Sequence, residues 1–225
     1  MEDSLGKIAR EIASCRACPR LVAWREEAAA TPPRRFRGQR YWARPVPGFG
    51  DARARLLVVG LAPAAHGGNR TGRVFTGDAS GDFLFAALHR AGYASQAESV
   101  SREDGLALTG AYVAAAARCA PPDNKPTPAE FARCLPFLVR EIAQLSSLRV
   151  VLALGAHGWR AAIEALVAHG APRPKPLPRF AHGAQARLGE ITLLGSYHVS
   201  QQNTFTRRLT PRMLDQVLRK AREIS

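Results

Sequence analysis

Apolar residues along this chain fall into two patterns, short continuous runs and stretches in which they recur with helical spacing. Each continuous run is apolar almost throughout, rather than at every second position. Such runs predict strands that are covered on both faces, as in a parallel sheet. Four of them qualify: Arg55–Leu61, Ala111–Ala117, Arg149–Leu154 and Ile191–Ser196.

Segments with helical spacing alternate with these runs. We expect a first helix from about Ser4 to Ala13 and another near Ser80–Ala91. The sequence Thr127-Pro128-Ala129-Glu130 predicts a helix start, because it combines a capping box with a proline in the first turn. Two further helices are expected, one holding Trp159, Ile163 and Leu166 and one starting at Thr210-Pro211.

This alternation predicts one α/β domain over residues 1–225, a three-layer α/β/α sandwich with a central four-stranded parallel sheet. The segments Thr31–Gly50 and Ala171–Phe180 are rich in proline and arginine and are expected to be loops. Ligands of such sheets bind beyond the carboxyl ends of the strands. Polar or glycine-rich segments follow three of the predicted strands: Gly60–Gly81, Arg118–Lys125 and Tyr197–Thr206.

The charge of the chain points to a polyanionic partner. Lys and Arg number 32 against 18 Asp and Glu, which gives a net charge of +14 over 225 residues. Nucleic acid is the first candidate partner and a membrane surface the second, while a generally basic or heat-adapted surface is the bland alternative. The N-terminus lacks the features of a signal peptide and no apolar stretch could span a bilayer, so we expect a cytoplasmic monomer without membrane contact.

The cysteines suggest a metal site. Cys15 and Cys18 form a Cys-x-x-Cys pair, Cys119 follows the second predicted strand and Cys134 lies in the next helix. Structural disulfides are not expected in the cytoplasm, and thiolates suit zinc or iron–sulfur clusters. Four cysteines with none left over favour a metal over two buried thiols and a redox pair, with the N-terminal segment 1–50 supplying two ligands. Their spacing does not separate zinc from [4Fe–4S].

The long loop after the first predicted strand carries the strongest functional signal. Gly60–Asp78 has neither a G-x-G-x-x-G pattern nor a P-loop, so a nucleotide cofactor is not indicated. Its glycines allow close approach of a ligand to the backbone. Arg70, Arg73, Phe75 and Asp78 provide the charged and aromatic groups that would hold a flat base and a phosphate.

Three motifs, GLAPAAHGGNRTGRVFTGDASG, ARCAPPDNKPTP and SYHVSQQNT, resemble those of family 5 uracil-DNA glycosylases. The leading Cys-x-x-Cys-Pro-Arg-Leu and the segment RYWARPVPGFGD match as well, so the resemblance covers essentially the whole chain. It implies a repair enzyme that flips uracil, and other deaminated bases such as hypoxanthine, out of DNA and hydrolyses the glycosidic bond. It also implies one [4Fe–4S] cluster on the four cysteines. Double-stranded DNA is the expected partner, and single-stranded DNA a second candidate.

The resemblance also implies roles for individual residues. Asp78 is expected to be the catalytic carboxylate, His198 to contact the extruded nucleotide in catalysis, Phe75 to stack on the base and Asn124 to line the base pocket. Gln201 and Gln202 lie where related enzymes insert a loop into the duplex. The remaining candidates are Gly60, Ala62 and Ala64 for the base, and Asn69, Arg70, Arg73, Ser200 and Asn203 for DNA.

The chain departs from related motifs at three positions. Family 4 enzymes carry a catalytic Glu where this chain has Leu61, so the acid must come from elsewhere, and Asp78 is available. Family 4 also has a base-reading Asn at the position of Ala115, which suggests a more permissive pocket here. Ala64 replaces the usual Gly of family 5, and its added methyl group is expected to crowd the loop.

Blander explanations exist for several of these residues. Asp78 precedes a helix and is a good N-cap, although Ser80 could cap instead. Asn124 could be a simple turn former. A non-catalytic iron–sulfur DNA-binding protein is the main alternative function, and an enzyme acting on free nucleotides is another. Asp78 and His198 after separate strands argue against the first, and the charge of +14 against the second.

Overall fold

The computed structural model describes residues 3–225. Its α-helices are α1 (Leu5–Ser14), α2 (Pro19–Ala30), α3 (Gly68–Thr71), α4 (Ala79–Arg90), α5 (Pro128–Gln144), α6 (Gly155–Ala168), α7 (Gln201–Phe205) and α8 (Pro211–Ile224). Its strands are β1 (Phe49–Gly50), β2 (Leu56–Gly60), β3 (Ala111–Ala115), β4 (Val150–Leu154), β5 (Gln185–Leu188) and β6 (Ile191–Ser196). Two short 3-10 helices are η1 (Arg34–Phe36) and η2 (Pro122–Asn124).

The strands form one sheet in the order β1-β3-β2-β4-β6-β5. The four central strands are parallel and correspond to the four predicted ones, which confirms the core of the expected fold. Two antiparallel edge strands, β1 and β5, were not predicted. β1 has only two residues, and β5 is largely exposed, so neither leaves a continuous apolar run in the sequence.

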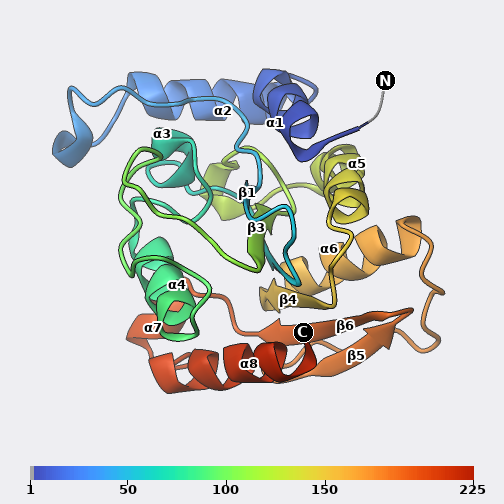
Figure 1. The fold of residues 1–225 in the computed structure, drawn as a ribbon. Coiled ribbons are helices and arrows are strands. Elements are labelled where there is room, and N and C mark those ends of the chain that lie inside the picture. Colours follow the sequence, from blue (N-terminus) through green and yellow to red (C-terminus); the bar gives the residue numbers. More distant parts are fainter. Residues whose placement is uncertain (1–2) are drawn as a thin grey trace.

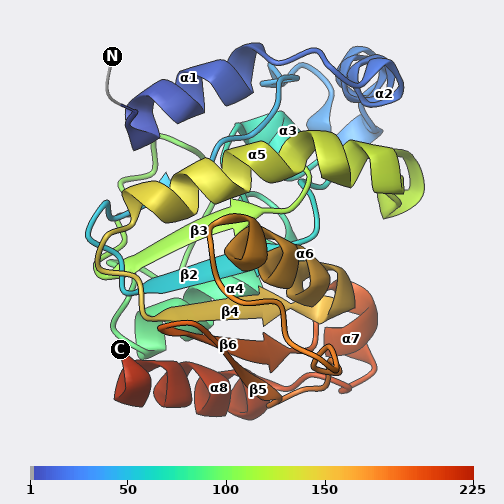
Figure 2. The same ribbon diagram turned by 90° about the vertical axis from the view of Figure 1, so that its right-hand side faces the viewer.

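Helices cover both faces of the sheet, as Figures 1 and 2 show. Because side chains alternate along a strand, Leu56 and Val58 pack against α4 and α8, while Leu57 and Val59 pack against α5 and α6. Two apolar cores therefore hold the central strands, and the strand ends are fixed by packing on both sides. None of the helices in residues 3–225 has the length and apolar character needed to cross a bilayer.

The N-terminal helices lie outside this sandwich (Figure 1). α1 packs on α5, and α2 contacts α3. The sequence predicted α1 but not α2, whose apolar residues have little helical periodicity. The first helix ends at Ser14, and Pro19 occupies the first turn of α2, where a missing N–H is harmless. Cys15 and Cys18 lie at this junction between the two helices.

The capping signals are confirmed. The Thr127 hydroxyl accepts from the backbone of Glu130, and the Glu130 carboxylate accepts from the backbone of Thr127 at 2.7 Å. Thr210 caps α8 and Ser4 caps α1 in the same way. These caps begin the helices at the residues that the sequence indicates, which determines where the following chain segments enter the site.

Candidate functional site

The predicted polar segments gather beyond the carboxyl ends of the parallel strands. The loop 61–78 leaves β2, Arg118 and Cys119 follow β3, α6 starts directly after β4, and His198 follows β6. Figure 2 shows α7 at the end of the sheet toward which the strand arrows point. The sheet therefore brings together residues that are more than a hundred positions apart in the chain.

Asp78 uses its two carboxylate oxygens differently. Oδ1 accepts hydrogen bonds of 3.0 Å from the backbone N–H groups of Ser80 and Gly81, so Asp78, not Ser80, is the N-cap of α4. Oδ2 faces Gly67, where an added Cβ would lie only 1.8 Å away. No residue within 3–225 donates a hydrogen bond to Oδ2. Capping thus fixes the carboxylate and leaves one oxygen free for chemistry.

The surroundings of Asp78 disfavour its charge. Burial raises the pKa of the Asp78 carboxyl above its ordinary value, although hydrogen bonds from the Gly81 and Ser80 amides act in the opposite direction. Nearby Asp82 adds to the increase in this pKa. Ionisable groups held in such surroundings are typical of catalytic sites.

Phe75 connects the two predicted catalytic residues. Its backbone adopts a left-handed conformation with φ of 49°, which is rare for a bulky residue and marks local strain. Its ring occupies the space where a Cβ on Gly60 would lie, 2.4 Å from the ring tip, so only glycine fits at the end of β2. The Phe75 ring centroid lies 6.1 Å from that of the His198 ring. The backbone carbonyl of Phe75 packs on Gly81, close to Asp78.

His198 is held as a neutral imidazole. Burial, with a smaller contribution from His157, lowers the pKa of His198 to about 4. Its Cβ lies 3.2 Å from where a Cβ on Gly155 would be, and its carbonyl accepts from the Asn203 amide at 2.8 Å. At neutral pH the ring can therefore donate one hydrogen bond without carrying charge.

Three residues predicted to bind DNA instead brace the loop 61–78. Arg70 donates to the carbonyls of His66 and Gly77, each at 2.8 Å, and so holds the backbone just before Asp78. Arg73 is 4% exposed and forms a two-pronged ion pair with Asp104.

Burial alone would raise the pKa of Asp104, but the bonds from Arg73 and from backbone amides lower it well below its usual range. The third brace, Asn69, is buried and donates to the carbonyls of Arg25 and Ala65. Internal partners hold the Asn69 and Arg73 side chains, and their contacts with DNA stay a prediction. Ala62 and Ala64 lie half-buried along the same loop, and Ala64 accepts backbone bonds that shape it.

Asn124 and the segment after His198 lie at the surface. Asn124 is exposed and has φ of 55° in η2, which agrees with the turn-former alternative. Gln201 and Gln202 are exposed on α7, while Ser200 and Asn203 are half-buried. Phe205, which the sequence reasoning missed, is 76% exposed at the end of α7. A lone Phe between two Thr residues in a polar motif is the signal that could have identified it.

The four cysteines line one small cavity. Cys18, Cys119 and Cys134 are buried, Cys15 is half-buried, and all four are free thiols. Burial raises the pKa of the Cys119 thiol to about 12, against the effect of Arg25.

Two buried guanidinium groups, of Arg25 and Arg118, line the same cavity, and the Nε atom of each has no hydrogen-bond partner within residues 3–225. In the described part of the chain, no three metal-binding side chains are arranged to hold a single ion. The four cysteines nevertheless fit a metal centre held by anionic thiolates, because sulfur is a soft ligand and two guanidinium groups supply positive charge nearby.

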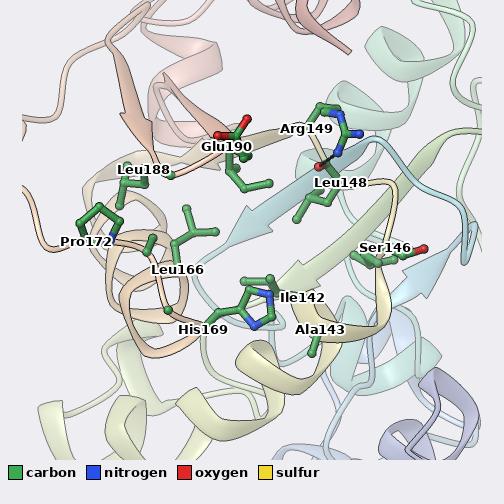
Figure 3. A pocket seen from close by; sticks show the side chains of 15 residues that line it. Ile142, Ala143, Ser146, Leu148, Arg149, Leu166, His169, Pro172, Leu188 and Glu190 are labelled. Carbon is green, nitrogen blue, oxygen red and sulfur yellow. Dashed lines mark hydrogen bonds between the residues drawn. The ribbon is translucent and has the colours of Figure 1, made fainter.

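A further cavity lies away from these residues. It measures about 360 Å³ and is lined by the amino ends of β4 and β6 together with the ends of α5 and α6. Figure 3 shows Arg149, His169 and Glu190 around it. No residue predicted for catalysis or for base binding contributes to its lining.

Known proteins of one superfamily match most of this chain. A profile described as the uracil DNA glycosylase superfamily matches residues 47–222. A protein of Thermus thermophilus named Type-5 uracil-DNA glycosylase is 54% identical over 95% of each chain. One of Mycobacterium tuberculosis with the same name is 53% identical over 95% of this chain and 79% of its own. A Type-4 uracil-DNA glycosylase of Pyrobaculum aerophilum is only 33% identical, over 56% of each chain.

Proposed function

Since this chain belongs to the uracil-DNA glycosylase superfamily, we propose that it is a DNA repair hydrolase that excises uracil from DNA and leaves an abasic site. The observation that carries this proposal is the state of Asp78, a half-buried carboxylate with one oxygen fixed and the other free. The high identity to enzymes named Type-5 supports catalysis over a purely DNA-binding role.

Excision requires that the target nucleotide leave the stack. Flipping a base out of a duplex costs a few kcal/mol and is easiest for a mispair such as uracil opposite guanine. Cleavage of the glycosidic bond then leaves positive charge on the sugar and negative charge on the base. In our proposal the free Oδ2 of Asp78 stabilises the sugar cation and orients the attacking water.

His198 and Phe75 act on the base. A neutral imidazole donates a hydrogen bond to the departing uracil anion without first requiring a proton from solvent. The Phe75 ring, adjacent to the His198 ring, stacks on the base and holds it in register. No lysine lies in the loop 61–78 or in the segment 197–206, so we expect hydrolysis rather than a Schiff-base intermediate.

The DNA-binding surface in this proposal surrounds α7. Gln201 and Gln202 are exposed there, and the exposed Phe205 ring suits insertion between base steps as an apolar wedge. The net charge of +14 supplies phosphate contacts, which suit double-stranded DNA and do not exclude single strands. Ala115, at the end of β3, offers no side-chain amide to the base, so hypoxanthine is a second candidate substrate beside uracil.

The four cysteines would hold one [4Fe–4S] cluster. The proposal is supported by a cavity lined by all four cysteines, whose number and soft sulfur ligands suit an iron–sulfur cluster. Bound there, the cluster would cross-link the α1–α2 junction, the end of β3 and α5. We expect this role to be structural, because hydrolysis of a glycosidic bond needs no electron transfer. Four free thiols suit a reducing compartment, and we place the enzyme in the cytoplasm.

The test is excision from a duplex with one uracil opposite guanine, scored as alkali-sensitive sites. Asp78→Asn is the matched variant, because Asn also caps helices and removes only the charge. We expect single-turnover excision to fall about 10²–10⁴-fold in the variant. Unchanged cleavage would move catalysis away from Asp78, and tight binding with no cleavage by either protein would refute the glycosylase assignment.

A further inference from the structure

Arg25, on α2, is a buried cation that faces the four cysteines. Its side chain is 2% exposed and lines the cysteine cavity. Nη1 donates to Cys119 Sγ at 3.0 Å, and both terminal nitrogens lie 3.4 Å from the carbonyl of Cys15. The remaining donor, Nε, is buried and has no acceptor in the described part of the chain. Arg25 therefore directs its guanidinium toward the sulfurs.

The second buried guanidinium at this cavity, Arg118, differs in one respect. It pairs through both terminal nitrogens with the Glu141 carboxylate, which also accepts from Tyr112 and from the backbone of Gly48. Arg16 and Arg20, in the same N-terminal region, have carboxylate partners as well. Within residues 3–225, Arg25 forms no ion pair with a carboxylate.

An unpaired buried charge is costly, and a guanidinium cannot avoid the cost by losing its proton. The cysteines would supply the anion that compensates Arg25, because metal-bound cysteines are thiolates and Cys119 already accepts a hydrogen bond from Arg25. We propose that Arg25 is a positioning residue of the four-cysteine site, whose guanidinium balances the thiolate charge and anchors Cys119. This inference rests on the cluster in the proposed function.

The backbone of Arg25 is held independently of its side chain. Its carbonyl accepts from the Asn69 amide at 3.1 Å, which ties α2 to α3 and to the loop that carries Asp78. Replacing the Arg25 side chain leaves this bond in place. The effect of a variant on the cluster therefore reports on the charge and the sulfur hydrogen bond, not on the position of α2.

The experiment compares Arg25→Gln with Arg25→Lys, and with Arg16→Gln as a control. Arg16 lies between two of the cysteines in sequence, but its side chain is 63% exposed and paired with Glu26, so its loss is screened by water. Readouts are iron and sulfide per chain, the rate of cluster loss to a chelator, and the midpoint potential. Removing a buried positive charge disfavours the more negative reduced state.

We expect Arg25→Gln to lose its cluster faster than the wild type, or to hold it at a more negative potential. Arg25→Lys should lie closer to the wild type, and Arg16→Gln should match it. Equal behaviour of Arg25→Gln and wild type would overturn the inference. So would equal loss of the cluster in Arg25→Gln and Arg25→Lys, because the role would then be shape rather than charge. A wild-type protein without iron and sulfide would instead refute the proposed cofactor.

Discussion

The two ends of the sheet differ: one has a cavity, and the other has ionisable side chains with shifted pKa values. The amino end has a cavity of about 360 Å³, with the exposed side chains of Arg149, His169 and Glu190 at its edge. The carboxyl end has a strained Phe75, a half-buried carboxylate with raised pKa and a half-buried imidazole with lowered pKa. Strain and ionisable groups with shifted pKa values, rather than concavity, mark the end to which our proposal assigns the chemistry.

Apart from substitutions of Asp78, His198→Ala is expected to have the largest effect on activity among the variants that compare the two ends of the sheet. Loss of one donor aimed at a developing negative charge lowers rates by about 10²–10³-fold. We expect a drop of this size in the single-turnover rate of uracil excision, with little change in affinity for undamaged duplex. A rate within about twofold of wild type would exclude a transition-state role for this imidazole.

Phe205→Ala tests the surface of the same end. Stacking of an aromatic side chain on a base contributes about 1–3 kcal/mol, so binding to the uracil duplex should weaken about 10-fold. Leu177→Ala is the matched control, because Leu177 is another exposed apolar side chain but lies in the loop 171–180. Equal affinities of the two variants, measured by fluorescence anisotropy, would remove Phe205 from the DNA-binding surface.

Asn69→Ala separates an internal brace from a DNA contact. The Asn69 amide links α2 to the loop 61–78, and its loss removes the buried hydrogen bonds that it donates to the Arg25 and Ala65 carbonyls. We expect the free energy of unfolding to fall by about 1–3 kcal/mol. The slope of DNA affinity against salt should stay as in the wild type, since no phosphate contact is lost. A shallower salt slope with unchanged stability would restore the role in DNA binding.

The smallest effect is expected at the amino-end cavity. Glu190→Gln and His169→Asn change exposed groups around it, and such substitutions alter stability by about 0.5 kcal/mol or less. Excision rates on the uracil duplex should match the wild type. A rate loss comparable to that of His198→Ala would reverse the comparison and place functional chemistry at the amino end.

The parts of the fold with strong local signals were predictable from the sequence. The four parallel strands are continuous apolar runs, and the caps at Thr127 and Thr210 are local contacts between near neighbours. α2 and β5 were not predictable, because α2 has little apolar periodicity and β5 alternates exposed polar positions at an edge. The order of the strands depends on contacts between distant segments, which no local pattern encodes.

The sequence predicted which residues gather near the site, but not whether their side chains point toward solvent or into the protein. Asp78 and His198 follow strands, so the fold class alone places them at one edge. Arg73 and Asn69 were expected to face DNA, yet they turn inward to Asp104 and to the Arg25 carbonyl. Both partners lie more than thirty positions away, so the motif that contains the two residues carries no sign of them.

The central claim is that an ionised Asp78, with a raised pKa, drives excision beside a neutral His198. Asp78 must be deprotonated to act, so the wild-type single-turnover rate should fall as the pH drops through its raised pKa, above the ordinary value of 3.8 for this group. His198 stays neutral until about pH 4, so Asp78→Asn should be slow and show no such fall above that pH.

The same burial means that ionised Asp78 destabilises the fold once the pH exceeds the ordinary carboxyl pKa, and Asn removes this penalty. The melting temperature of Asp78→Asn should therefore be no lower than that of the wild type. The most direct measurement is the pH profile of the single-turnover rate for both proteins. An acid limb that persists in Asp78→Asn, or a wild-type rate that stays flat down to the ordinary carboxyl pKa, would contradict the account.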